Sequence, residues 1–387
     1  QSPVGSGDPG GPRTFGLGGF LLADGMFFVV DGDSGMLRLI EASTTGYKEL
    51  ASAQVLSGED VWGPLALSDH RLVLRDMSQM VCLQVGPPVA GKVTAMTFGD
   101  VMDSNETGAP TLPHRYTRTK VVVGPGLPGE FRRSLSGLAL GPRDAIYALG
   151  DDEVRVFEAG GRLARTWKVP EKATCLGLAS DGRVGVGSPG RVDLYSDAGV
   201  RIGGFVAGTR DKPADVTAIR LIRDEVLVAD AAARVIRRYD LRGTEQGVIG
   251  AKNKTGGFML PNKSLDFDVD ASGVVHATDT GRHQVTSWTL DGTMVASFGK
   301  FGMANPEDFV GCCNPVNVAV APDGSIVTAE KMVARVKVYG KGRTLLAVIG
   351  PENFDPLCWH IYIAVDSTGR IVTADPERRT IAVFERL

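Results

Sequence analysis

The stretch Glu225-Val-Leu-Val-Ala-Asp-Ala-Ala-Ala-Arg-Val-Ile-Arg-Arg-Tyr239 decides the fold. It holds two strand-like runs on either side of a short turn, and Asp230 stands nine positions before Tyr239. The same spacing recurs from Asp279 to Trp288, from Glu330 to Tyr339 and from Asp375 to Phe384. Repeats of about 20–50 residues indicate stacked supersecondary units, so the sequence predicts a β-propeller.

Aromatic residues align two earlier copies of the unit as well. The six alignment points are Phe157, Tyr195, Tyr239, Trp288, Tyr339 and Phe384. Each unit begins with a short apolar strand such as Val318-Ala-Val-Ala and turns at a pair such as Asp323-Gly324, where glycine supplies the positive φ of a tight hairpin. Three further strands follow, which is the pattern of a propeller blade.

The sixth unit lacks its fourth strand, because the sequence stops at Leu387. The run Lys120-Val-Val-Val-Gly124 resembles the other fourth strands and has no unit of its own. We expect it to pair with residues 380–385 and to close the ring, which removes exposed sheet edges. The predicted fold class is therefore all-β, with a six-bladed β-propeller over residues 119–387.

One segment of this region, Ala277-Thr-Asp-Thr-Gly-Arg-His-Gln-Val285, resembles the NHL-repeat pattern of a small residue, Asp, a turn, a basic residue and a strand. The resemblance covers roughly residues 119–387. It is better in the last four units than in the first two, whose turns Gly150-Asp-Asp-Glu and Gly187-Ser-Pro-Gly lack the aligned acid. NHL proteins include binding platforms, RNA-binding modules and a minority of lyases, so the resemblance implies a fold and leaves those functions open.

Residues 1–98 resemble a different repeat, the blade of quinoprotein-like (PQQ-like) propellers. The runs that carry this resemblance are 20–31, 36–42, 62–67 beginning at Trp62, 71–75 and 80–85. They suffice for about two blades, whereas PQQ needs the centre of a complete ring. We expect a PQQ-like β subdomain over residues 1–98 and a linker over residues 99–118.

The composition suits a β-rich protein, with 50 glycines and 21 prolines. A net charge of -3 argues against nucleic acid as a partner. No apolar run approaches the roughly 18–20 residues of a transmembrane segment. The Ser-, Gly- and Pro-rich stretch Gln1–Pro12 is typical of a terminus left after signal-peptide removal, or else of another cleavage product or an engineered boundary. We expect an extracytoplasmic protein, periplasmic or secreted.

Three cysteines and one histidine form the most chemically suggestive group. Cys313 and Cys358 each lie six positions before the aligned alanine of an inner strand, so they should occupy the same rim of neighbouring blades. Cys312 precedes Cys313, and His360 follows Cys358 by two positions. Three interpretations stay open: a disulfide between Cys358 and Cys312 or Cys313, thiols that only pack, and a zinc, iron or copper site formed by Cys312, Cys313, Cys358 and His360.

A basic residue follows each repeated acid after four or five positions. The pairs are Asp230 with Arg234, Asp279 with His283, Glu330 with Arg335, and Asp375 with Arg379. We expect each acid to cap the turn of its hairpin and to pair with that basic residue. A calcium site or a catalytic role is the alternative for these acids.

The sequence contains no phosphate-binding loop, no Gly-x-Ser-x-Gly elbow and no Cys-x-x-Cys motif. We therefore expect a noncatalytic scaffold without a cofactor: a protein-binding or assembly subunit of a larger complex. The alternative is a metal-dependent enzyme or redox accessory protein with a metal ion at the Cys312/Cys313/Cys358 rim. RNA binding would need a contiguous basic face, which the negative net charge disfavours.

Overall fold

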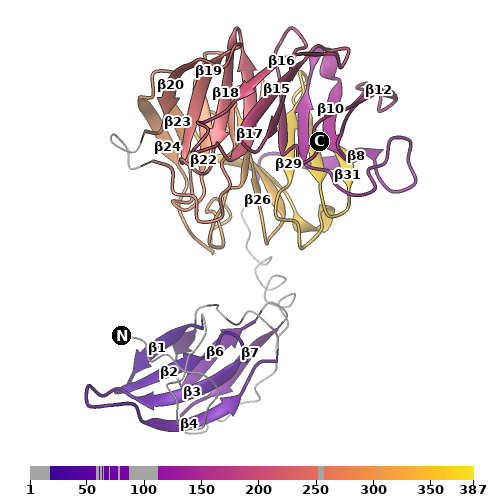
Figure 1. Ribbon diagram of the computed structural model, residues 1–387. Helices are drawn as coiled ribbons and strands as arrows, with labels where there is room; N and C mark the ends of the chain where they lie inside the picture. Colours follow the sequence, from indigo (N-terminus) through magenta and orange to yellow (C-terminus); the bar gives the residue numbers. More distant parts are fainter. Residues whose placement is uncertain are drawn as a thin grey trace. The chain divides into compact units, whose positions relative to one another are not determined.

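The computed structural model describes residues 18–57, 61, 63, 65–68, 70–76, 79–86, 112–251, 257–303 and 305–387. The chain divides into two compact units, Gln1–Thr111 and Leu112–Leu387, and each is described by itself (Figure 1). Helical residues in the described ranges are confined to two short 3-10 turns, Pro142–Asp144 and Pro351–Asn353. None of the helices in these ranges is long and apolar enough to cross a membrane.

The first unit contains two antiparallel sheets in its described part. One has four strands, β1 (Phe20–Ala23), β2 (Met26–Val30), β3 (Met36–Glu41) and β4 (Glu49–Gln54). The other has three, β5 (Ala66–Ser68), β6 (Arg71–Arg75) and β7 (Met80–Gln84). Alternate residues of both sheets, including Phe28, Val30, Leu72 and Leu74, bury their side chains in one shared core. The predictions for Gln1–Pro12, for Trp62 and for positions 99–111 of the linker lie outside the described residues.

The second unit is built from four-stranded antiparallel sheets, six of them in its described part. The first two contain β9 (Gly137–Leu140), β10 (Ile146–Gly150), β11 (Glu153–Phe157) and β12 (Leu163–Lys168), then β13 (Cys175–Leu178), β14 (Val184–Ser188), β15 (Arg191–Tyr195) and β16 (Arg201–Val206). The next two contain β17 (Val216–Ile222), β18 (Glu225–Asp230), β19 (Val235–Asp240) and β20 (Glu245–Ile249), then β21 (Phe267–Val269), β22 (Val275–Asp279), β23 (Gln284–Trp288) and β24 (Met294–Phe298). The fifth contains β25 (Asn317–Val320), β26 (Ile326–Glu330), β27 (Arg335–Tyr339) and β28 (Leu345–Ile349).

The last sheet joins the two ends of this unit. It is formed by β29 (Tyr362–Val365), β30 (Ile371–Asp375), β31 (Thr380–Arg386) and β8 (Tyr116–Val123). In Figure 1 the magenta β8 lies beside the yellow β31. The pairing runs from Val123 opposite Ile381 to Tyr116 opposite Arg386. Positions 116–118, which we assigned to the linker, therefore belong to β8, because the backbone groups at the end of β31 also find their partners there.

Contacts between the first strands arrange the six sheets in a ring. β9 contacts β13, and the contacts continue through β17, β21, β25 and β29 back to β9. The unit is thus a β-propeller, and its first strands surround a central channel.

The aligned aromatic residues explain why the sheets pack. Each lies on the third strand of its sheet, opposite a residue at the start of the second strand, as Tyr239 lies opposite Val226 and Trp288 opposite Val275. All six aromatic side chains are buried. Burying one such side chain is worth about 1.5–3 kcal/mol, so the repeated aromatic stabilises every sheet of the ring. At the first hairpins, Gly273 and Gly324 adopt φ of 88° and 81°, as the turns require.

Candidate functional site: central channel and incoming loops

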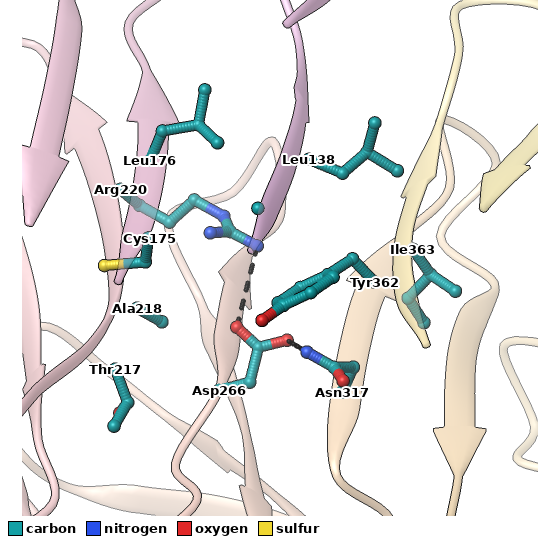
Figure 2. A pocket seen from close by; sticks show the side chains of 11 residues that line it. Leu138, Cys175, Leu176, Thr217, Ala218, Arg220, Asp266, Asn317, Tyr362 and Ile363 are labelled. Atoms are coloured by element: carbon teal, nitrogen blue, oxygen red, sulfur yellow. Dashed lines mark hydrogen bonds and ion pairs between the residues drawn. The ribbon is translucent and has the colours of Figure 1, made fainter. Parts of the chain in front are cut away.

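The first strands of all six sheets begin around one end of the central channel. A small cavity of about 30 Å³ lies there. It is lined by Gly137, Leu138, Cys175, Leu176, Thr217, Ala218, Arg220, Asp266, Asn317, Tyr362 and Ile363. Figure 2 shows that the polar groups of Arg220, Asp266, Asn317 and Tyr362 point toward one another.

Asp266 is the centre of this polar group. Its Oδ2 accepts hydrogen bonds from the backbone N–H of Val318 (3.0 Å) and from Asn317 Nδ2 (3.1 Å). Its Oδ1 lies 3.9 Å from the Arg220 guanidinium, as the dashed line in Figure 2 marks. Burial raises the pKa of Asp266, so its charge depends on these partners.

A second carboxylate, Asp268, completes the network. Its Oδ1 accepts from Arg220 Nε at 2.9 Å, and its Oδ2 accepts from the backbone N–H of Val320 at 2.9 Å. Arg220 also donates to the carbonyl of Ile219. Because first strands line the channel, their inner edges have N–H groups without a strand partner. Asp266 and Asp268 satisfy two of these groups on β25 and so tie the fourth sheet to the fifth.

Hydroxyl groups make further ties between neighbouring segments at the starts of the first strands. Thr174 Oγ1 donates to the carbonyl of Val216 at 2.6 Å, and Thr217 Oγ1 donates to the carbonyl of Leu265 at 2.7 Å. One acceptor in the channel, Asn317 Oδ1, is buried without a partner. The cavity has room for about one water molecule, which would satisfy that oxygen.

The predicted cysteine rim is only partly brought together. Cys312 is exposed, Cys313 is buried, and their sulfur atoms lie 3.4 Å apart. The Cys358 thiol is buried and points to the carbonyl oxygen of His360 at 3.3 Å, and burial raises its pKa to about 12. The His360 ring stacks on Tyr362, and burial lowers its pKa to about 4, so the imidazole is neutral at pH 7.

Neither bonded arrangement is present in the described part of this structure, and both stay predictions. The cysteines are all free thiols, so Cys358 is not bridged to Cys312 or Cys313. Within the part of the chain that the structure describes, no three His, Cys, Asp or Glu side chains are grouped so that they could hold a metal ion. The thiols of Cys358 and Cys313 point in different directions: the Cys358 thiol faces the carbonyl oxygen of His360, whereas the Cys313 thiol faces the sulfur of Cys312.

All four repeated acids hold the loop that leads into their own sheet, and Asp230 and Asp375 also cap their hairpins by accepting from the N–H groups of Ala233 and Arg378. Backbone N–H groups of these incoming loops donate to each acid: Asp215 to Asp230, Met259 to Asp279, Val310 to Glu330, and Asp355 to Asp375. All four carboxylates are buried. The first sheet has an equivalent that we did not expect, because Asp151 accepts from the N–H groups of residues 132, 133 and 134.

Of the four predicted acid–base pairs, only Glu330 with Arg335 is present. The other acids pair with different arginines: Asp230 with Arg237, Asp279 with Arg282, and Asp375 with Arg378. His283 instead donates from Nε2 to the carbonyl of Gly311 at 2.7 Å. The residues expected as partners end their hairpins in the left-handed region, with φ of 58° at Arg234, 57° at His283 and 50° at Arg379, which turns their side chains away.

A fully buried lysine accompanies Glu330. Lys337 Nζ donates to the carbonyl of Asp308 at 2.6 Å and lies 3.4 Å from Glu330 Oε2. Burial lowers the pKa of Lys337 to about 8. We did not single out this residue, although a lysine in the middle of the apolar strand Arg335-Val-Lys-Val-Tyr339 is a usable signal.

Exposed apolar side chains gather on three successive incoming loops, those before β21, β25 and β29. We call this set the apolar rim; it consists of Met259, Phe301, Met303, Leu357 and Trp359. The hydrogen bonds of the repeated acids hold these loops at the end of the ring where the first strands begin. The apolar rim therefore lies on the same face as the channel mouth.

Both aromatic residues of the apolar rim pack on the preceding sheet. The ring of Phe301 contacts the ring of His283 edge-on at 5.2 Å between centroids. Trp359 covers the ammonium group of Lys331, which lies 4.6 Å from the centre of the indole. Lys331 is only 2% exposed, whereas Trp359 is 59% exposed. Each aromatic is thus fixed on one side and open to solvent on the other.

A second cavity, about 420 Å³ in volume, lies between the first two sheets. It is formed by connections at the opposite strand ends, including the β9–β10 and β13–β14 turns. Two acids of its lining, Glu158 and Asp181, are held in ion pairs with Arg162 and Arg183. We assign no function to it.

Comparisons with known proteins support the propeller fold and give no information about function. No family model matches the chain, and no curated protein matches its sequence. A solved protein of unknown function from Bacteroides thetaiotaomicron is similar with a TM-score of 0.51 and 13% identity over 94% of both chains. A streptogramin B lyase has a TM-score of 0.48 and 11% identity over 71% of this chain and 98% of that chain. Virginiamycin B lyase from Staphylococcus aureus has a TM-score of 0.43 and 12% identity over 71% of this chain and 87% of that chain.

Proposed function

We propose that the propeller is a noncatalytic protein-binding subunit of a larger complex and that the apolar rim holds its partner. One observation carries the proposal: exposed apolar side chains, of which Phe301 and Trp359 are packed on the preceding sheet, lie on three loops beside a channel whose carboxylates are engaged by Arg220 and backbone N–H groups.

The small volume of the channel cavity and the contacts of its carboxylates favour a binding role over a catalytic one. Its cavity of about 30 Å³ is far smaller than the roughly 300–1,000 Å³ of small-molecule sites. Asp266 and Asp268 are held by Arg220 and by backbone N–H groups of β25. These contacts support a structural role for the two carboxylates.

The apolar rim has the properties of a protein-binding surface. Tryptophan is enriched among the residues that dominate binding energy, and Trp359 presents most of its indole to solvent. Its contact with Lys331 holds the ring in one position, so binding loses little side-chain entropy. We infer that the partner is a protein that places apolar side chains against Trp359 and Leu357.

The proposal also includes the repeat families of the two units, the number of blades and the cellular location. We propose that the second unit is an NHL-type scaffold with six blades and that the first unit is a pair of PQQ-like blades, supported by its four-stranded and three-stranded sheets. We also propose that the protein works outside the cytoplasm. Cell fractionation of the complete gene product tests that location directly, because a cytoplasmic pool alone would contradict it.

Photo-crosslinking tests the proposed function. The crosslinking amino acid p-benzoylphenylalanine replaces Trp359 in one variant and Val295 in the control. Val295 lies on β24, the outermost strand of the fourth sheet, and is 52% exposed, so it is matched in accessibility but lies away from the rim. The crosslinked protein is identified by mass spectrometry, purified, and mixed with the wild-type chain to measure the dissociation constant.

The proposal predicts one defined partner that crosslinks from position 359 and not from position 295, and that binds again when purified. Crosslinks from both positions to the same proteins would mean nonspecific contact. A crosslink only to a second copy of this chain would contradict the proposed larger complex and would indicate a homo-oligomer instead.

A further inference from the structure

Two adjacent cysteines on an incoming loop have no role in the proposed function. Cys312 is exposed and Cys313 is buried, and the two sulfur atoms lie 3.4 Å apart. The two thiols point to each other, although neighbouring side chains can point to opposite sides of an extended chain. One thiol can therefore meet a reagent from solvent while the other waits beside it.

The backbone on both sides of the cysteine pair is anchored. The carbonyl of Gly311 accepts a hydrogen bond from His283 at 2.7 Å. After the pair, Asn314 is fully buried: its Nδ2 donates to the carbonyl of Val310 at 2.7 Å, and its Oδ1 accepts from the N–H of Lys331 at 2.9 Å. These anchors hold the two thiols together and confine any change of the pair to residues 311–314.

We propose that Cys312 and Cys313 form a vicinal dithiol that low-molecular-weight disulfides oxidise to a Cys312–Cys313 disulfide. The site is thus a modification site for small thiols and disulfides, and it differs from a disulfide that would join Cys358 to the same loop.

The reaction has two exchange steps. The Cys312 thiolate attacks one sulfur of the reagent; the reagent's S–S bond breaks, one thiolate leaves, and Cys312 carries a mixed disulfide. The Cys313 thiolate then attacks the Cys312 sulfur and releases the second reagent thiolate. The two cysteines are oxidised, the reagent disulfide is reduced to two thiols, and the two protons of the protein thiols pass to the leaving thiolates.

The order of the steps follows from exposure. The reagent can reach Cys312, whereas burial and the neighbouring Cys312 thiol raise the pKa of Cys313 to about 11, opposed by the Lys331 ammonium group. A thiol with so high a pKa has a small thiolate fraction, so the second step is slower than the first. The mixed disulfide on Cys312 should appear transiently.

The product should be easily reduced. Adjacent Cα atoms are about 3.8 Å apart across a trans peptide, below the usual range of about 4.4–6.8 Å for disulfides. The ring that closes over one peptide bond is therefore strained, and strained disulfides are the labile ones. This chemistry gives a reversible switch on the face that carries the apolar rim.

Trypsin digestion separates the relevant cysteines and makes the test direct. Cys312 and Cys313 share one tryptic peptide, Phe301–Lys331, which contains no other cysteine. Cys358 lies in another, Thr344–Arg370. The native full chain is treated with oxidised glutathione, free thiols are blocked with iodoacetamide under denaturing conditions, and the unreduced digest is examined by mass spectrometry.

The expected result is a Phe301–Lys331 peptide that is unalkylated and lighter than its reduced form by two hydrogen atoms, and that regains both thiols with dithiothreitol. In Cys313→Ser the mixed disulfide with glutathione should accumulate on Cys312. In Cys358→Ser the light peptide should form as in the wild type.

Three results would overturn the proposal. The first is a peptide alkylated on both cysteines after treatment, and the second is a wild-type chain that stops at the mixed disulfide. The third is a crosslink between Phe301–Lys331 and Thr344–Arg370 that disappears in Cys358→Ser. Thermal unfolding of each variant verifies that it is folded before oxidation.

Discussion

Replacing Asp266 by alanine tests whether the channel network holds the propeller together. The carboxylate accepts from the N–H of Val318 at 3.0 Å and from Asn317 Nδ2 at 3.1 Å, and its side chain is largely buried. Asp266→Ala leaves both donors without their acceptor, at the point where the fourth and fifth sheets meet.

The size of the effect follows from these contacts. A hydrogen bond to a charged group contributes about 1.5–3 kcal/mol, so two give a gross loss of about 3–6 kcal/mol. Two terms reduce that loss. Burial raises the pKa of Asp266, so removing the carboxylate also removes a buried charge, and Arg220 keeps its ion pair with Asp268 at 2.9 Å. We expect the free energy of unfolding to fall by about 2–3 kcal/mol and Tm to fall by roughly 4–10 °C.

Differential scanning calorimetry of the full chain measures the change, because it resolves the transition of the propeller from that of the first unit. Asp266→Asn is the matched control: it keeps an oxygen that can accept from Val318 and Asn317, so it should lose less than half as much stability. Wild-type stability in Asp266→Ala would refute the structural role of the network. Equal losses in both variants would mean that charge matters more than the hydrogen bonds.

Three further outcomes follow from the structure. The pKa of Lys337 falls from 10.5 to about 8 on folding, so between these pH values the unfolded chain binds more protons than the folded one. The free energy of unfolding of the wild type should therefore rise with pH relative to that of Lys337→Met. The same dependence of the unfolding free energy on pH in both proteins would count against this. Asp279→Ala removes the acceptor of the Met259 N–H, and hydrogen exchange at that amide should become at least tenfold faster, whereas unchanged protection would show that the loop is held by other contacts. The native protein should contain no stoichiometric metal by elemental mass spectrometry; a metal lost in Cys358→Ser would instead restore the metal-dependent alternative at the cysteine rim.

The class of fold was predictable because it depends on repetition. The aromatic of each unit and the glycines of the first hairpins recur at fixed spacing, and in the structure they serve one packing role and one turn geometry. The prediction of an all-β propeller is confirmed.

The partners of the repeated acids were less predictable. Local spacing suggested that Arg234 would form the ion pair with Asp230. Arg234 adopts a left-handed conformation that turns its side chain away, and Arg237 on β19 forms the ion pair instead. The incoming loop that each acid holds lies well before it in the sequence, as Met259 lies 20 positions before Asp279. Spacing within a hairpin contains no information about such a contact.

The channel network was missed for a related reason. Arg220, Asp266 and Asn317 come from three different sheets, and each looks like an ordinary polar residue near a strand end. They meet only because the third, fourth and fifth sheets pack side by side. The apolar rim was missed as well, because exposure of Trp359 depends on how its loop packs on Lys331.

The most direct test of the proposed binding role is the dissociation constant of the purified crosslinking partner for three chains: wild type, Trp359→Ala and Val295→Ala. Loss of a residue that dominates binding costs about 2 kcal/mol or more, so we predict roughly thirtyfold weaker binding for Trp359→Ala. The Val295→Ala chain should bind as the wild type does. Equal affinities for all three chains would contradict the assignment of the apolar rim as the partner-binding surface.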